Sequence, residues 1–264
     1  MEYLLNTPPT KLARLNAHPR DSLLHFDPIP HTYTVNGEGG YTSVTTWNHS
    51  HFKEFDADLV ITNMMRSVNW SKSQYYGKTR EEIKAGWEQN RDEAATLGTQ
   101  LHYDIECYYN DALPSSFDWN SRPEIQYFRK FLMDWGSMIP HRTEWMVFDE
   151  ELKLAGSIDM TFINTDGTLQ IYDWKRSKQC LKTSRFGEFS KTECISHLPD
   201  TNYWHYSLQL NTYKYIIEKN YGQTVTDMYL VFLHPNNDNG SYKRVKVADL
   251  QSEIRELMSL RKKQ

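Results

Sequence analysis

The spacing of apolar and polar positions along the chain changes between helical and strand-like patterns. In several segments apolar residues recur every three to four positions, a period typical of helices that bury one face. These segments are residues 56–66, 123–135, 202–220 and the stretch from Leu250 onward. Each of them is expected to form a helix, and the segment from Leu250 onward is expected to form an amphipathic one.

A helical pattern also covers the stretch before residue 110. Thr79 is a capping residue for a helix that begins at Arg80, and a long helical segment follows over residues 92–109. Because glycine weakens the interior of a helix, we expect this segment to be broken at Gly98.

Strand-like patterns dominate after Pro140. Short β-prone runs bounded by turn residues predict strands over residues 143–148, 154–163 and 169–174. The almost wholly apolar run 224–233 predicts a strand that is buried on both faces. An exposed strand is expected over residues 242–247.

The order of these segments predicts the organisation of the chain. Near the N-terminus, residues 31–35 and 41–47 are β-prone. In the second half the order is helix, three strands, helix and strand, which indicates an α/β core. We therefore expect residues 91–264 to form this core and residues 1–90 to form a mainly helical attachment packed on it.

The composition excludes two classes of protein. Hydrophobic residues make up 39% of the 264 residues and charged residues 24%, whereas a disordered chain has too few apolar groups to form a core. The longest apolar run, Met228 to Leu233, is far shorter than the roughly 20 residues that span a bilayer. A membrane is therefore not an expected partner.

The N-terminus and the cysteines predict an intracellular protein. Glu2, Pro8 and Pro9 do not fit the basic and apolar regions of a secretory signal. The three cysteines are too few and too scattered for a disulfide framework, which favours a reducing compartment.

The net charge of −4 gives no sign of a nucleic-acid partner, but basic residues cluster locally. Six of them face only one acid, Glu188, and they are Lys175, Arg176, Lys178, Lys182, Arg185 and Lys191. A second cluster comprises Lys243, Arg244 and Lys246. Because most such runs are solvated faces, the charge pattern alone leaves the partner open.

Two acidic residues at the ends of predicted strands form the clearest chemical pattern. Asp159 ends a Gly-Ser-Ile-Asp motif, and Asp173 opens an Asp-Trp-Lys motif that ends at Lys175. A hairpin would bring both carboxylates to one side of a sheet, where they offer the oxygen ligands that Mg²⁺ or Mn²⁺ requires. Lys175 leaves the same strand face as Asp173 and could orient an attacking water. The alternative interpretation of Asp173 and Lys175 is an ordinary ion pair on the protein surface.

Two helical motifs supply further polar side chains. His102 and Glu106 are four residues apart and share a helix face. The imidazole could provide a metal ligand or serve as a structural hydrogen-bonding group. Gln209 and Tyr213 likewise share a face, and they could contact DNA or pack at the edge of the core.

In this order, the motifs resemble the RecB-like branch of the PD-(D/E)XK nuclease superfamily. The matching positions are Gly98, His102, Glu106, residues 156–159, residues 173–175, Gln209 and Tyr213. The front segments 31–35 and 43–46 are similar to those of the mitochondrial genome maintenance exonuclease and its phage relatives.

The resemblance implies a restriction-endonuclease-like core, in which helices flank a central mixed sheet. The implied metal ligands are His102, Asp159, Asp173 and the main-chain carbonyl of Trp174, with Mg²⁺ or Mn²⁺ as the ion. The implied catalytic residues are Asp159, Asp173, the lysine Lys175 and an assisting glutamate, Glu144. The implied DNA contacts are Gln209, Tyr213, Arg176, Ser177, Lys178, Ser43 and Thr45.

The function implied by the resemblance is that of a metal-dependent DNA nuclease, with a single-stranded DNA exonuclease of replication, repair or recombination as the first candidate. Such an enzyme could work with other proteins of these processes and could be encoded by a virus or phage. Aromatic residues that could stack on an unpaired strand are Trp70, Tyr75, Tyr76 and Trp87.

Two alternatives remain open at this point. The same core could belong to a structure-specific endonuclease, or to a module that binds nucleic acid without cutting it. No iron–sulfur cluster is expected, although several relatives hold one with four cysteines, because three cysteines without a close pair cannot ligate it in that way.

Overall fold

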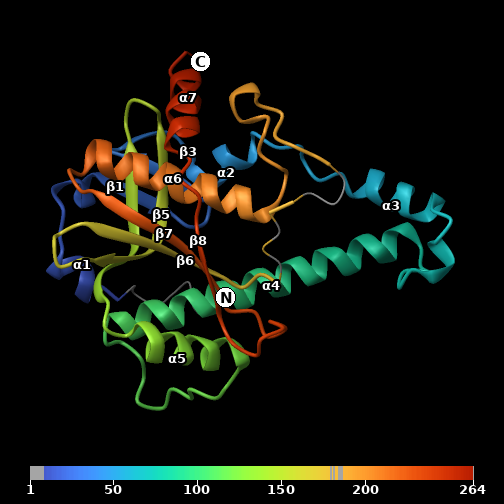
Figure 1. The fold of residues 1–264 in the computed structure, drawn as a ribbon, viewed down its shortest axis with the longest axis horizontal. Helices are drawn as coiled ribbons and strands as arrows, with labels where there is room; N and C mark the ends of the chain where they lie inside the picture. Colours follow the sequence, from blue (N-terminus) through green and yellow to red (C-terminus); the bar gives the residue numbers. More distant parts are fainter. Residues whose placement is uncertain (1–8, 179, 181, 184–186, 264) are drawn as a thin grey trace.

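The computed structural model describes residues 9–178, 180, 182–183 and 187–263. Within them, a mixed eight-stranded sheet lies at the centre and helices cover its faces (Figure 1). The strands are β1 (Leu24–Asp27), β2 (Thr32–Val35), β3 (Glu38–Ser43), β4 (Ile139–Asp149), β5 (Leu154–Ile163), β6 (Leu169–Lys175), β7 (Val225–Phe232) and β8 (Lys243–Lys246).

The helices are α1 (Lys11–Leu15), α2 (Val44–His49), α3 (Ala57–Arg66), α4 (Arg80–Tyr109), α5 (Pro123–Trp135), α6 (Asn202–Asn220) and α7 (Gln251–Arg261). Within the described residues, the short 3-10 helices are η2 (Pro19–Leu23), η3 (Trp70–Lys72) and η4 (Glu193–Ile195). The predicted α/β core with a mixed sheet flanked by helices is confirmed. The first ninety residues add strands β1 to β3 to the same sheet, besides helices. Among the described helices, none combines the length and apolar character needed to cross a bilayer.

The strand pairing along one edge of β5 is interrupted. The strand order is β1-β2-β3-β5-β6-β7-β8, and β4 pairs with the other edge of β5. On the first edge, β3 runs parallel to β5 and pairs with Leu154 and Ala155. On the same edge, β6 runs antiparallel to β5 and pairs with its residues Met160 to Ile163. Residues 156–159 of β5 therefore lie where β3 and β6 diverge, and the last of them is Asp159.

Opposite faces of the sheet are covered by different helices. Alternation along β6 places Ile171 in a buried cluster with residues of α2, α6 and α7. The next residue, Tyr172, belongs to a second cluster, which contains residues of α5 and the end of α4. Because Asp173 and Lys175 have the same parity as Ile171, they belong to the α6 side of the sheet.

Helix α4 departs from the sequence expectation, because it continues through Gly98 as one helix of 30 residues. Its start is fixed by a capping box, in which Thr79 accepts a hydrogen bond from the main chain of Glu82 and the Glu82 side chain accepts one in return. A single glycine costs only about 1 kcal/mol in a helix interior. The predicted break at Gly98 is therefore wrong. Figure 1 shows α3 and the first half of α4 projecting from the body of the molecule.

The predicted strand over residues 41–47 is also too long. The strand ends at Ser43, and α2 begins at Val44. The Ser43 hydroxyl accepts a hydrogen bond of 3.0 Å from the main-chain nitrogen of Thr46, which caps the helix. The cap outweighs the strand preference of the β-branched residues that follow.

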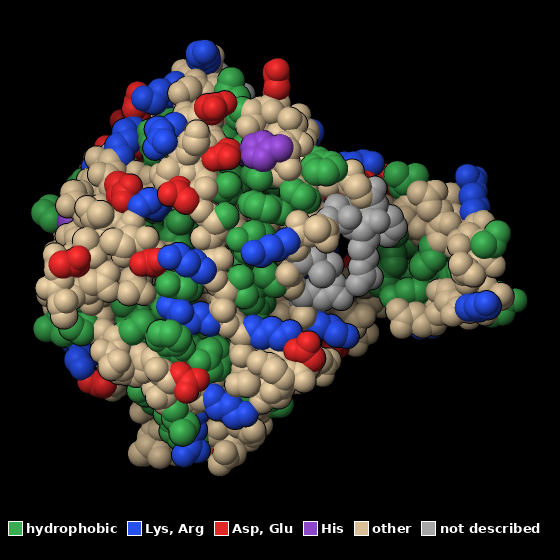
Figure 2. Space-filling view, in the orientation of Figure 1, with side chains coloured by type: hydrophobic (Ala, Val, Ile, Leu, Met, Phe, Trp, Pro, Cys, Tyr) green, Lys and Arg blue, Asp and Glu red, His purple; other side chains and the backbone are tan. Residues whose placement is uncertain are grey.

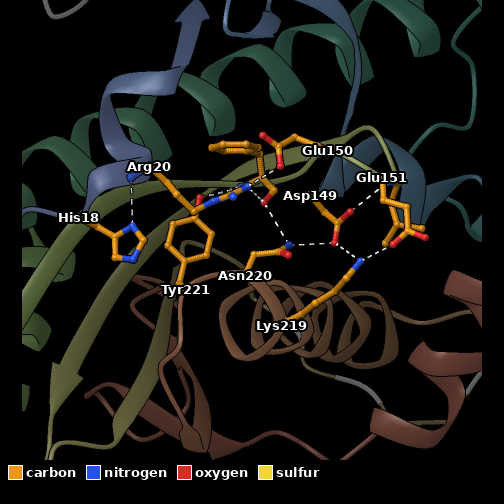
Figure 3. Close-up of polar contacts among 10 residues, drawn as sticks. His18, Arg20, Asp149, Glu150, Glu151, Lys219, Asn220 and Tyr221 are labelled. Carbon is orange, nitrogen blue, oxygen red and sulfur yellow. Dashed lines mark hydrogen bonds and ion pairs between the residues drawn. The ribbon is translucent and has the colours of Figure 1, made fainter.

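A polar network fixes the end of α6 to the turn between β4 and β5. Figure 3 shows Lys219 and Asn220 pointing at the carboxylate of Asp149. Asp149 is 1% exposed, and its other oxygen accepts a hydrogen bond from the main-chain nitrogen of Leu152. The network therefore holds α6 in place against the hairpin that carries the acidic residues described next.

Candidate active site

Residues 156–159 of β5 are not paired with the end of β6, and we call this unpaired region of the sheet the opening. The side chain of Asp159 lies in it. Its Oδ2 accepts a hydrogen bond of 2.9 Å from the main-chain nitrogen of Trp174. In an unbroken ladder, a main-chain carbonyl of β5 would accept that bond. The divergence of the two strands thus replaces a main-chain acceptor by a carboxylate and holds it at the end of β6.

Asp173 and Lys175 lie together on the α6 side of β6, as their spacing predicts. The Lys175 Nζ lies 2.8 Å from Oδ2 of Asp173 and 4.4 Å from the centre of the Tyr206 ring. Burial would lower the pKa of Lys175, but Asp173 and Asp159 raise it above its usual value. The lysine is therefore a fixed cation at the edge of the opening.

His102 reaches the opening from α4, on the opposite side of the sheet. Its Nε2 lies 2.8 Å from the carbonyl oxygen of Trp174. Its Nδ1 lies 3.6 Å from Oδ2 of Asp159 and 3.7 Å from Oε1 of Glu144. The imidazole thus stands among two carboxylates and one main-chain carbonyl.

Glu144 enters the site through an unusual main-chain conformation. It lies in β4 between Thr143 and Trp145, which pair with Met160 and Ile158 of β5, and its φ is 42°, in the left-handed region that disfavours residues with a Cβ. Its Oε2 accepts a hydrogen bond of 2.8 Å from the hydroxyl of Ser157. Strain of this kind persists where the surroundings fix the residue, and it is common at functional sites.

The site concentrates negative charge in a partly buried space. Burial raises the pKa of Asp159 above its usual value, although His102 opposes the rise. Burial and the charge of Glu144 raise the pKa of Glu106, one turn after His102 on α4, to about 8. Burial would lower the pKa of His102, but Asp159 and Glu144 raise it to about 9. Such a set favours a bound cation.

The donor set fits a divalent ion of the Mg²⁺ or Mn²⁺ type. One ligand atom each of His102, Glu144 and Asp159 lies within 4.8 Å of the others. His102 approaches the two carboxylates with Nδ1, at 3.6 and 3.7 Å, whereas its Nε2 makes the 2.8 Å hydrogen bond with the Trp174 carbonyl, so the ring can offer one of its two nitrogens to an ion. Of the four predicted ligands, the fourth, Asp173, lies beside this group and contacts Lys175.

Gln209 and Tyr213, the predicted DNA contacts on α6, lie on the α6 side of the opening. Tyr213 is 3% exposed, and the Gln209 side chain forms a hydrogen bond with it. A Cβ on Gly156 would lie 2.7 Å from the Tyr213 hydroxyl, so only glycine lets α6 approach β5 this closely. This close approach explains the glycine of the motif.

The predicted contacts that follow β6 differ in environment. The Arg176 Nε lies 2.6 Å from Oε1 of Glu124, which is 4% exposed, so this pair joins the end of β6 to α5. Ser177 forms a side-chain hydrogen bond with Tyr206, and Lys178 is exposed. Arg185 of the basic run lies outside the described residues.

The remaining predicted contacts lie at the start of α2. Ser43 is the N-cap residue, and Thr45 is exposed. The sequence reasoning missed Ser157, which binds Glu144. Ser157 pairs with Met146 in the β4–β5 ladder, two positions after Glu144, so the contact depends on the register between two strands and not on the pattern within either strand.

Comparison with known proteins assigns the chain to a family. The family model of the PD-(D/E)XK nuclease superfamily matches residues 71–263, a segment that contains every side chain of the opening described above. Among solved structures, the chain is similar to a protein from Eubacterium rectale that is provisionally named an exonuclease. The sequence identity is 13%, the alignment covers 84% of this chain and 77% of that one, and the TM-score is 0.36. No curated protein matches the chain.

Proposed function

Because this chain belongs to the PD-(D/E)XK nuclease superfamily, whose members cut nucleic acids with divalent metal ions, we propose that it hydrolyses phosphodiester bonds of DNA. Its substrate is single-stranded DNA attacked from an end, and it belongs to the RecB-like branch. The observation that carries the proposal is the meeting of His102, Glu144 and Asp159 at the opening of the sheet.

In this proposal one Mg²⁺ or Mn²⁺ ion is held by Asp159, Asp173, the ring of His102 and the carbonyl of Trp174. When bound, the ion lowers the pKa of a water and offsets the charge that develops on the phosphate. His102 must release its proton to bind the ion, because a metal ligand has to offer a lone pair. The acids that raise the pKa of His102 also supply the attraction that draws the cation in.

Lys175 supports the reaction from the α6 side of the opening. Its ammonium donates to Asp173 and lies over the Tyr206 ring, so its position is fixed before the substrate arrives. From there it can donate a hydrogen bond to a phosphate oxygen or to the attacking water. A pre-oriented cation stabilises the transition state without further reorganisation.

Glu144 orients the attacking water and receives its proton. Ser157 donates to one oxygen of Glu144, which leaves the second oxygen directed at His102 at 3.7 Å. A carboxylate held in this way is within reach of a water bound at the same opening. The strained main chain at Glu144 is consistent with such a role.

Residues around the opening hold the DNA strand. Ser43 and Thr45 from α2, Ser177 and Lys178 after β6 provide donors for phosphate oxygens, whereas Arg176 acts by fixing the end of β6. Gln209 and Tyr213 pack against β5 and support the residues on which the DNA strand lies. Figure 2 shows further Lys and Arg side chains on the face that carries α6 and β8.

The preference for an unpaired strand rests on the projecting helices. Tyr76, between α3 and α4, is 61% exposed, and its ring centre lies 6.0 Å from that of Trp70. Tyr75 accepts a hydrogen bond of 2.9 Å from the indole of Trp87. The exposed ring of Tyr76 can stack on an unpaired base, and the partly buried rings of Trp70, Tyr75 and Trp87 surround it or pack beside it.

The test is a gel assay with labelled linear single strands, duplexes and closed single-stranded circles, each with Mg²⁺, Mn²⁺ or a chelator. We expect cleavage of the linear single strand with either ion and none with the chelator. Asp173→Asn should abolish cleavage, whereas Asp166→Asn, in the exposed turn after β5, should leave it unchanged. Full activity of Asp173→Asn would overturn the proposed site, and efficient cutting of the circle would overturn the requirement for an end.

A further inference from the structure

A second cluster of titratable side chains lies outside the metal centre, where α2 packs on α6 (Figure 1). The Nε2 of His205 lies 2.8 Å from Oδ1 of Asp200, just before α6. The His205 ring contacts two further rings in this region at tilted angles, with centres 4.0 Å from Phe52 and 5.6 Å from His49. None of these residues contributes to the opening described above.

The cluster adjoins the opening on the side of Lys175. His205 precedes Tyr206 on α6, and the Tyr206 ring contacts Lys175 at 4.4 Å. Burial lowers the pKa of His49, and the charge of Lys175 lowers it further. His49 therefore lies within electrostatic range of Lys175, the lysine that is proposed to contact the reacting phosphate.

His49 is available to a ligand. It is exposed, and its ring forms no hydrogen bond with any residue that the structure describes. It lies four residues after Thr45, which is also exposed, so both side chains share one face of α2. A DNA strand bound at Thr45 could therefore also contact His49.

We propose that His49 donates a hydrogen bond to the phosphate next to the scissile one, and that the His205–Asp200 pair positions its ring. The proposal rests on the proposed function. An imidazole N–H is a suitable donor for a phosphodiester oxygen, and contacts to neighbouring phosphates fix the register of a strand. Holding the neighbouring phosphate places the scissile one at Lys175 and the opening.

The test combines protein variants with single neutral phosphates in the substrate. Wild type, His49→Ala and His49→Gln are compared on short single strands, each of which carries one methylphosphonate at successive linkages. On the unmodified strand, we expect His49→Ala to lower kcat/KM about tenfold, mainly through KM, since one hydrogen bond to a charged group is lost. His49→Gln, which keeps a donor, should recover part of the loss.

The decisive result is coupling at one linkage beside the cut. There the methylphosphonate should slow the wild type and leave His49→Ala unaffected, while at other linkages the two effects should multiply. His197→Ala, an exposed histidine beside Glu253 on another part of the surface, is the matched control and should behave like the wild type.

Two other outcomes separate this inference from the function on which it rests. Metal-dependent cleavage that is indifferent to His49, or a His49→Ala loss that is equal on every modified strand, overturns the inference alone. No cleavage by the wild-type chain overturns the proposed function and, with it, the inference.

Discussion

At Glu144 the main chain and the side chain have opposing requirements. The residue adopts φ of 42°, which is unfavourable for any residue with a Cβ, yet this conformation brings its carboxylate to Ser157 and towards His102. Residues at functional sites commonly keep such strain because the surroundings enforce it. At this position, stability and the proposed activity should therefore respond in different directions to mutation.

Glu144→Gly and Glu144→Ala both remove the carboxylate, but only glycine relieves the main chain. We expect the glycine variant to be more stable than the alanine variant by about 1 kcal/mol, the reverse of the usual order in a strand. Urea unfolding measures the difference, and both variants should lose DNA cleavage. An alanine variant more stable than the glycine variant would contradict the strain.

Gly156 is fixed by a neighbour rather than by its own conformation. A Cβ there would lie 2.7 Å from the Tyr213 hydroxyl and 2.9 Å from its ring. We expect Gly156→Ala to lower the free energy of unfolding by about 2 kcal/mol. In a Tyr213→Ala background the same change should cost much less, because the obstruction is gone. If Gly156→Ala destabilised both backgrounds equally, its effect would not come from the contact with Tyr213.

At the scale of the elements, patterns predicted well what depends on local spacing. Helices α3 and α5 follow the periodicity of their own residues. Helix α6, which is buried on several sides, and strands β5 to β7 were located from their composition and from the turn residues that bound them. The end of β3 and the continuity of α4 depend on single positions, the cap at Ser43 and the glycine at Gly98, where weak local preferences compete. Periodicity cannot decide such competitions.

The same reasoning explains what was recognised in the site. His102, Asp173 and Lys175 stand out because each lies in a motif on one helix face or at the end of a strand, and Asp159 stands out as the acid of a Gly-Ser-Ile-Asp motif, although it lies in the interior of β5 and not at its end. Their convergence depends on the divergence of β5 and β6, and the Ser157–Glu144 contact depends on the β4–β5 register. Neither is encoded within a single segment.

Because α4 is continuous, Gly98 is an ordinary interior position of a helix with open space around it. We expect Gly98→Ala to raise the free energy of unfolding by up to about 1 kcal/mol. Denaturant unfolding monitored by circular dichroism measures the change. No gain, or a loss, would indicate that the chain needs a flexible joint at this position.

At the scale of the whole molecule, the two ends of α6 serve different purposes. Its first half faces Lys175 and β5, whereas its last residues bind the β4–β5 turn through Asp149 (Figure 3). The hairpin that carries Glu144 and Asp159 is thereby tied to the helix that carries Tyr206. The geometry of the opening depends on contacts at the far end of the same elements.

Removal of the buried acid should destabilise the whole fold. Asp149→Ala removes the buried acceptor that Lys219 and Asn220 share, and it leaves Lys219 only the exposed Glu151, so we expect a loss of about 3 kcal/mol in the free energy of unfolding. Glu151→Ala, which removes an exposed partner of the same lysine, should change stability little. Thermal and urea unfolding of both variants test this contrast, and similar losses would show that Asp149 is not the anchor.

The central claim is that the acids and the imidazole at the opening of the sheet hold one divalent ion. Calorimetric titration of Mn²⁺ into the wild type, Asp159→Asn and the control Asp166→Asn tests it without reference to any substrate. We expect the wild type and the control to bind Mn²⁺ with equal affinity, and Asp159→Asn to bind it at least about tenfold more weakly. Equal binding by Asp159→Asn, or no binding by the wild type, would contradict the claim.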